Sequence, residues 1–176
     1  MKALAAVFLS VALRAQGPSS ATEEQLRPVL IFQLAQYVNW PDTRPKPGDA
    51  LRFCILDNPD LADSLAFIVH GKSIQDRPLA VSKVKFPADL KACHVVFIGI
   101  SRQKSLRDLF AQWTYPPTLV VGEAEGFAEL GGMVNLKVSG GRVTLQINIA
   151  NTERAGLKVR SQLLNLAQLV GGSAAR

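Results

Sequence analysis

Hydrophobic and polar positions alternate along two neighbouring segments in the C-terminal part of the chain, residues 133–138 and 142–149. Alternation with a period of two is typical of strands that bury one face. Gly140 and Gly141, between the segments, tolerate the positive φ angles of a tight turn. The pattern predicts an antiparallel hairpin with Val138 opposite Val143. After a short helical turn, apolar residues from Ser161 to Val170 recur at helical spacing and predict a terminal helix packed on the hairpin.

Earlier in the chain, short apolar runs alternate with helical patterns. Strands are expected at 51–56, 79–84, 95–100 and 118–121. Helices are expected at 21–39, from 61 to near Gly71 and at 101–113, with a short turn or helical piece at 87–90. This order predicts a single α/β domain with a mostly parallel sheet flanked by helices on both faces. The antiparallel hairpin would extend the sheet at one edge, and the terminal helix would close the fold.

The first helix carries its own start and stop signals. Thr22 and Gln25 form a capping-box pattern, and Pro41 is expected to end the helix at Asn39 and Trp40. Pro28 predicts either an irregular turn or a fresh start of the helix. Residues 42–50, rich in proline and charge, are predicted to be a surface loop.

Residues 1–21 have the layout of a signal peptide, with one early lysine, an apolar stretch from Ala3 to Leu13 and small residues beyond. Cleavage after Ala15 or after Ala21 fits this layout, and an uncleaved anchor is the alternative. The expected mature domain, residues 22–176, would be soluble and periplasmic. Cleavage after Ala21 would remove Lys2 and Arg14 and so lower the formal net charge from +6 to +4. The remaining basic residues are scattered, which argues against a nucleic-acid surface.

The chain has two cysteines, Cys54 and Cys93. In an exported protein an even pair favours a disulfide, because the compartment is oxidising. The alternative is a metal site that also uses His70 and His94, but these four residues do not have the spacing of known zinc ligand pairs.

The sequence offers little for catalysis. A nucleophile elbow of the GxSxG type is absent, both histidines have ordinary structural explanations, and the glycines from Gly122 to Gly132 do not match a phosphate-binding loop. Glu123, Glu125 and Glu129 are interpreted as solvated charges. We therefore expect a protein without catalytic residues, cofactor or metal.

A binding surface for a partner or ligand is the remaining expectation. Trp40 stands at an element end, where an aromatic residue can anchor a partner. The candidate contact residues are Trp40, Phe127, Glu129, Gly131, Gly132 and Met133.

Several stretches, in order, resemble the YfiR/HmsC-like family of exported bacterial proteins. They are FQLAQYVNWP at 32–41, LRFCILD at 51–57, ACHVVFIG at 92–99, GFAELGGMVNL at 126–136 and INIANTERAGLKVRSQLLNLAQLV at 147–170. The resemblance implies a non-catalytic periplasmic regulator that represses an inner-membrane diguanylate cyclase by binding its periplasmic region, which lowers cyclic-di-GMP and disfavours biofilm.

The same resemblance implies a homodimer, an OmpA-like outer-membrane lipoprotein that can sequester the regulator, and a disulfide between Cys54 and Cys93. Some family members carry a second cysteine pair after the position of Gly122, which this chain lacks. The alternative function is a periplasmic small-molecule sensor without a cyclase partner, with its pocket at the carboxyl ends of the strands beside residues 123–132.

Overall fold

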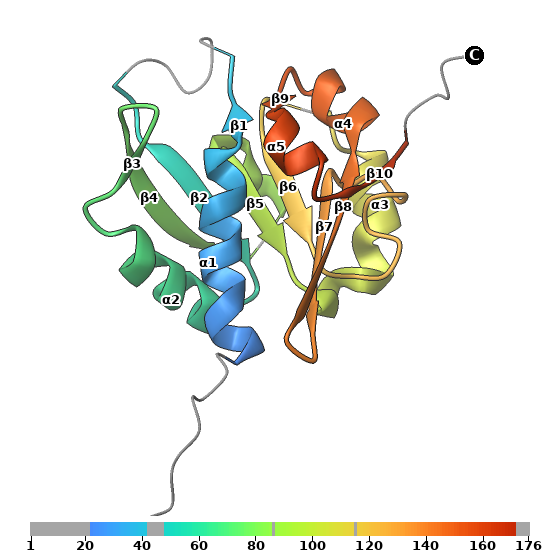
Figure 1. Cartoon of the computed structure of the whole chain (residues 1–176), viewed down its shortest axis with the longest axis horizontal. Helices are drawn as coiled ribbons and strands as arrows, with labels where there is room; N and C mark the ends of the chain where they lie inside the picture. The colour runs from blue at the N-terminus through green and yellow to red at the C-terminus, as the bar shows by residue number, and fades with distance from the viewer. Residues whose placement is uncertain (1–21, 42–47, 86, 115, 172–176) are drawn as a thin grey trace, which may run out of the picture.

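The computed structural model describes residues 22–41, 48–85, 87–114 and 116–171 (Figure 1). The expected signal peptide and most of the expected 42–50 loop lie outside these residues. The helices are α1 Glu23–Gln36, α2 Pro59–Val69, α3 Leu106–Ala111, α4 Ile149–Arg154 and α5 Ser161–Leu164, with 3-10 segments η1 Pro87–Ala92 and η2 Ile100–Ser105. The strands are β1 Val38–Asn39, β2 Leu51–Leu56, β3 Ser73–Ile74, β4 Arg77–Val84, β5 Val95–Ile98, β6 Leu119–Gly122, β7 Val134–Ser139, β8 Arg142–Asn148, β9 Lys158–Val159 and β10 Gln168–Val170.

The main sheet has eight strands in the order β10-β8-β7-β6-β5-β2-β4-β3. Strands β4, β2, β5, β6 and β7 are mutually parallel, whereas β3 and β8 run antiparallel to their neighbours β4 and β7. β1 and β9 pair separately as a two-stranded antiparallel sheet. The predicted α/β fold with a mostly parallel sheet is therefore confirmed.

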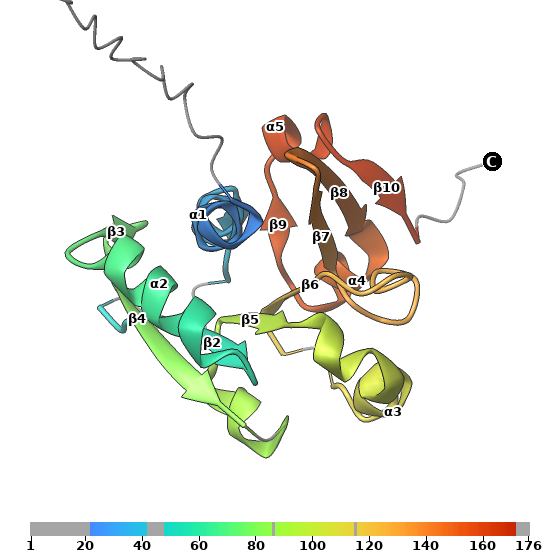
Figure 2. The same cartoon turned by 90° about the horizontal axis from the view of Figure 1, so that it is seen from below.

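Helices cover both faces of the sheet. Seen from below, α1 and α2 lie on one side of the β2 and β5 region, and α3 lies on the other (Figure 2). The central strands are buried on both faces, since every residue of β5 and β6 is buried. Their continuous apolar runs follow from this, because neither face of these strands meets water.

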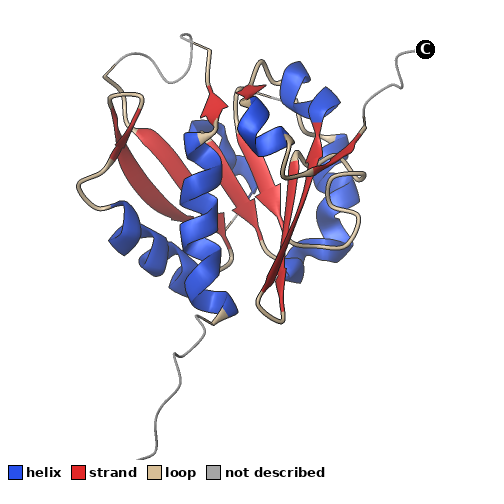
Figure 3. Ribbon diagram, viewed as in Figure 1, coloured by secondary structure: helices blue, strands red, loops and turns tan. Residues whose placement is uncertain are grey.

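Helix α1 crosses the middle of the molecule in front of the sheet (Figure 3). Its expected capping box is confirmed, as Thr22 Oγ1 accepts from Gln25 N and Gln25 Oε1 accepts from Thr22 N. The helix runs without interruption through Pro28, which is buried. It ends at Gln36, three residues before the predicted end at Asn39, because Val38 and Asn39 pair with β9 instead.

The hairpin register is the one predicted from the alternating pattern. Val138 lies opposite Val143 across a turn in which Gly140 and Gly141 both have positive φ. Val134 and Leu136 are fully buried, but Val143, next to the turn, is 44% exposed. The backbone N–H of Gly140 in the turn donates to Glu23 Oε1 at the start of α1, at 2.9 Å.

Two helix predictions need correction. The chain after β5 forms a 3-10 segment from Ile100 before the short α3, rather than one helix over 101–113. The predicted terminal helix over 161–170 is a four-residue α5, after which β10 pairs in parallel with β8. β8 would otherwise be a sheet edge with unpaired backbone groups, and this pairing outweighs the helical spacing of the side chains.

Candidate functional site

The loop between β6 and β7, residues 123–133, is folded around the side chain of Phe127. This ring is fully buried and fits between two glycines. A Cβ atom at Gly122 or at Gly132 would come within 2.2 Å of it. Phe110 of α3 packs edge-on against Phe127, with ring centroids 5.4 Å apart. The glycines are therefore required for packing around an aromatic ring, and they leave no cradle for a phosphate.

Two asparagines from the junction of β8 and α4 hold this loop from the other side. The side-chain amide of Asn148 donates to the carbonyl of Ala128 at 2.9 Å. The amide of Asn151 donates to the carbonyls of Gly131 and Gly132, both at 3.0 Å. Asn148 Oδ1 also accepts from the backbone N–H of Asn151 and so caps α4. The two asparagines thus donate to three backbone carbonyls and hold the loop in place.

Sequence reasoning missed the role of these asparagines. In the alternating pattern of residues 142–149, Asn148 falls at a polar position and is expected to face water. Both Asn148 and Asn151 are instead more than 90% buried. The available signal was the repeat of asparagine at a strand-to-helix junction, which is the position that a helix N-cap occupies.

The start of the loop is tied to the first helix. Arg27 Nε of α1 lies 2.9 Å from Glu123 Oε2, and both side chains are largely buried, with 19% and 15% exposed. The interpretation of Glu123 as a solvated charge is therefore wrong.

The candidate contact residues occupy different environments. Phe127 and Met133 are fully buried, Gly132 is buried, and Trp40 is 6% exposed beyond the end of β1. Glu129 is exposed and Gly131 is half-buried. Glu129 thus offers the most accessible side chain of the set, and the buried members support the loop from beneath.

Glu129 borders an open hollow of about 400 Å³ beside the hairpin. Its other walls are Glu125 and Gly126 of the loop and the polar face of β7 and β8, formed by Asn135, Lys137, Thr144 and Gln146. The side-chain amides of Asn135, Gln146 and Gln168 join in a chain across β7, β8 and β10. This hollow presents carboxylates, amides and one ammonium group, which suits polar contact with another molecule.

The cysteines form a disulfide that joins Cys54 of β2 to Cys93, two residues before β5 begins. The Cα atoms of Cys54 and Cys93 are 5.8 Å apart, and both side chains are buried. Next to it, His94 accepts the backbone N–H of Arg52 at 3.0 Å through Nδ1. Within the described residues, no group of three or more histidines, cysteines, aspartates or glutamates is arranged to hold a metal ion.

Comparison with known proteins links most of the chain to one family. The model of the YfiR/HmsC-like family matches residues 24–168. Among the residues that the structure describes, no helix is long and apolar enough to cross a membrane.

A solved structure has a similar fold. The crystal structure of a conserved domain protein from Vibrio cholerae O1 biovar El Tor strain N16961 superposes with a TM-score of 0.51 at 15% sequence identity. The alignment covers 86% of this chain and 61% of that protein, so the chain spans about three fifths of its length. At this identity the likeness concerns the fold alone.

Proposed function

The chain belongs to the YfiR/HmsC-like family of periplasmic regulators, and from this premise we propose that it represses an inner-membrane diguanylate cyclase. In this proposal residues 1–21 are a signal peptide, and the mature domain binds the periplasmic region of the cyclase. Binding lowers cyclic-di-GMP and biofilm formation. The observation that carries the proposal is the family match over 24–168, which includes the loop, both asparagines and both cysteines.

The mechanism is a shift of a conformational equilibrium. A regulator that binds the inactive state of the cyclase more tightly than the active state displaces the equilibrium toward the inactive state. A difference in binding free energy of about 2.7 kcal/mol changes the ratio of the two states about a hundredfold. The regulator itself needs no catalytic residue for this. The proposal also includes a homodimer and release of the cyclase when an OmpA-like outer-membrane lipoprotein binds the regulator.

Deletion of the gene tests the repressor function. Cellular cyclic-di-GMP should rise on deletion and return to its former level when the gene is supplied on a plasmid. A strain that lacks the cyclase encoded nearest to this gene serves as control and should show no rise. Unchanged cyclic-di-GMP after deletion would argue strongly against repression.

Direct binding tests the proposed contact surface. We propose that Glu129 contacts the partner, since it is the exposed side chain among the candidates. Glu129→Lys should weaken binding of the purified mature domain to the periplasmic region of the cyclase in calorimetry. Glu24→Lys, at an exposed position in the first turn of α1, is the matched control. Equal affinities of the two variants would place the contact elsewhere.

A further inference from the structure

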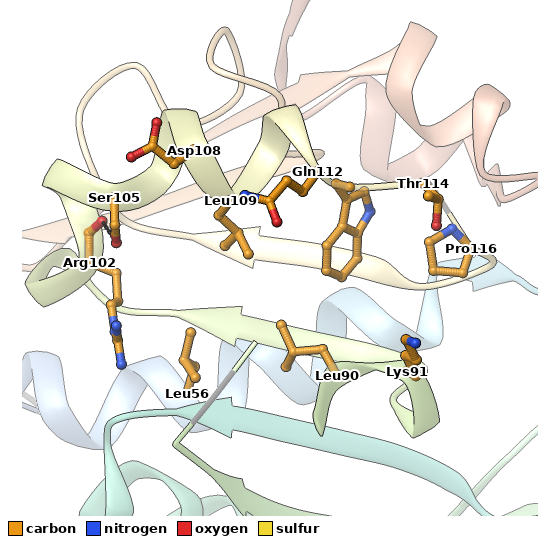
Figure 4. Close-up of a pocket in the computed structure, with 11 residues that line it drawn as sticks. Leu56, Leu90, Lys91, Arg102, Ser105, Asp108, Leu109, Gln112, Thr114 and Pro116 are labelled. Atoms are coloured by element: carbon orange, nitrogen blue, oxygen red, sulfur yellow. Dashed lines mark hydrogen bonds between the residues drawn. The ribbon is translucent and has the colours of Figure 1, made fainter. Parts of the chain in front are cut away.

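A cavity of about 480 Å³ lies between η1 and α3, away from the loop described above (Figure 4). Leu56, the last residue of β2, lines it together with Leu90 of η1 and Leu109 of α3, and Trp113 and Pro116 complete its apolar lining. Leu90 and Leu109 point toward one another across the opening in Figure 4. The volume falls within the range of about 300–1,000 Å³ that is typical of sites for small ligands. We name this cavity the α3 groove.

The topology of the sheet places one end of the α3 groove at a favoured position for ligands. The chain passes from β2 to its neighbour β4 on one side, and then crosses to β5 on the other side of β2. The strand order therefore reverses between β2 and β5. In open α/β sheets, ligands bind outside the carboxyl ends of the strands at such a reversal. Leu56 ends β2, and Arg102 and Ser105 follow β5, so the groove opens at this point.

A charged pair joins the two loops at the reversal. Arg102 after β5 contacts the carboxylate of Asp57 after β2 through both Nε and Nη2. Nη2 also donates to the carbonyl of Lys85 at 3.1 Å. Asp57 has a φ of 56°, an unusual value for a residue other than glycine. Backbone strain of this kind is concentrated at functional sites.

The same contacts leave one edge of the guanidinium available. Nη1 of Arg102 makes no hydrogen bond or ion pair with the described residues, although the rest of the group is fixed by Asp57 and Lys85. A guanidinium held in this way presents donors in a fixed geometry, which suits a carboxylate. Asp108, the acidic residue in the lining, is turned away from the groove in Figure 4.

We propose that the α3 groove binds a small organic carboxylate whose apolar body lies against Leu56, Leu90 and Leu109 and whose head accepts hydrogen bonds from Arg102. This site is distinct from the proposed partner contact at Glu129 and does not depend on a cyclase. It makes the chain a ligand-binding protein as well as a regulator by contact.

The test uses the purified mature domain with decanoate and 2-naphthoate as probes, which separate aliphatic from aromatic bodies. The chain has two tryptophans. A Trp40→Phe variant therefore leaves Trp113, in the groove wall, as the single fluorophore. Saturable quenching or a spectral shift is expected below the concentration at which decanoate forms micelles. Decanol and 2-naphthalenemethanol, which lack the anionic head, should bind about tenfold more weakly.

Variants locate the site by calorimetry. Arg102→Gln removes the head contact, and Leu109→Glu places a negative charge in the groove while Arg102 is retained. Both should weaken binding of the carboxylate about tenfold or more, because a charge-assisted contact is lost or opposed. Leu166→Glu is the control, since Leu166 is 78% exposed on the opposite part of the fold beyond α5 and does not line the groove. It should bind like the unaltered domain.

The proposal fails if neither carboxylate binds saturably, or if both groove variants bind as well as the control. Saturable binding of one probe alone supports the site and assigns the aliphatic or aromatic class. If circular dichroism shows that the groove variants fold poorly, the fluorescence change of Trp113 on adding each probe to the Trp40→Phe domain still decides whether the groove binds a carboxylate. Repression of the cyclase is measured separately, so the two proposals can fail independently.

Discussion

At the scale of single residues, the packing of Phe127 between Gly122 and Gly132 gives a sharp prediction. Gly132→Val should destabilise the domain by about 3 kcal/mol, since its Cβ would meet both the ring and the backbone carbonyl of Phe127. Urea denaturation measures the loss. Gly140→Asn is the matched control, because Gly140 has open space around it and asparagine tolerates its positive φ.

A second substitution makes the Gly132 test specific. Phe127→Leu, combined with Gly132→Ala, should recover part of the stability that Gly132→Ala loses alone, because the smaller side chain makes room for the new methyl group. Simple additivity of the two losses would contradict the packing described here. A folded Gly132→Val variant that had lost only partner binding would instead identify the loop as a contact surface.

Asn151 provides a prediction about polar contacts. Its amide donates to the carbonyls of Gly131 and Gly132, so Asn151→Ala should cost about 2 kcal/mol. Asn151→Asp should cost more, because a carboxylate would face the same oxygens. Thermal unfolding at neutral pH compares the two variants. Asn165→Asp, at an exposed position, should be close to neutral. If Asn151→Asp were the milder change at Asn151, the donor role assigned to this amide would be wrong.

At the scale of elements, the β3–β4 hairpin is built with unfavourable turn residues. Gln75 and Asp76 both have positive φ, at 52° and 60°. Asp76→Gly should stabilise the domain by about 0.5 kcal/mol, because glycine is preferred at the second central position of such a turn. Gln75→Gly should not, since the Gln75 amide donates to Val38 O and to Asn39 Oδ1, both at 2.9 Å. Chemical denaturation of both variants separates backbone strain from these contacts, and a gain for Gln75→Gly would refute the argument.

The elements also show which features a single sequence can reveal. The hairpin and the capping box of α1 were predictable, because turn glycines, strand alternation and a cap are local signals. β10 was not, because Leu163 and Leu166 have helical spacing and only the unpaired edge of β8 favours a strand there. The helix predicted over 101–113 is too long, because the chain forms a 3-10 segment from Ile100 to Ser105 before α3 begins at Leu106.

The candidate site also combines features that have a local sequence signal with features that depend on tertiary contacts. Local sequence singles out the loop and Glu129 as candidates, and their role stays a prediction. The contacts of Asn148 and Asn151 with the loop carbonyls join segments about 20 residues apart. The α3 groove is even harder to predict from the sequence, because it depends on the crossover that places Arg102 beside Asp57. Contacts set by topology have no signature in the spacing of residues along one segment.

At the scale of the whole molecule, the disulfide links β2 to the segment just before β5, and the sheet reverses its order between these two strands. Cys54 and Cys93 are 39 residues apart, and the segment between them includes α2, β3, β4 and η1. Cross-linking residues at this separation restricts the unfolded chain and stabilises the fold by roughly 4 kcal/mol in the chain-entropy model. The bridge therefore closes the loop that contains the β3–β4 edge of the sheet, and both of its ends lie near the centre of the sheet.

The double variant Cys54→Ala, Cys93→Ala should accordingly lose about 4 kcal/mol of unfolding free energy in urea relative to the oxidised domain. The unaltered domain measured in reducing buffer is the matched control, and should unfold at nearly the same urea concentration as the double variant because both lack the cross-link. Thiol titration of the oxidised domain under denaturing, non-reducing conditions should detect no reactive cysteine. Two reactive thiols per chain would show that the bridge does not form, and any stability difference would then have to come from packing of the buried cysteines alone.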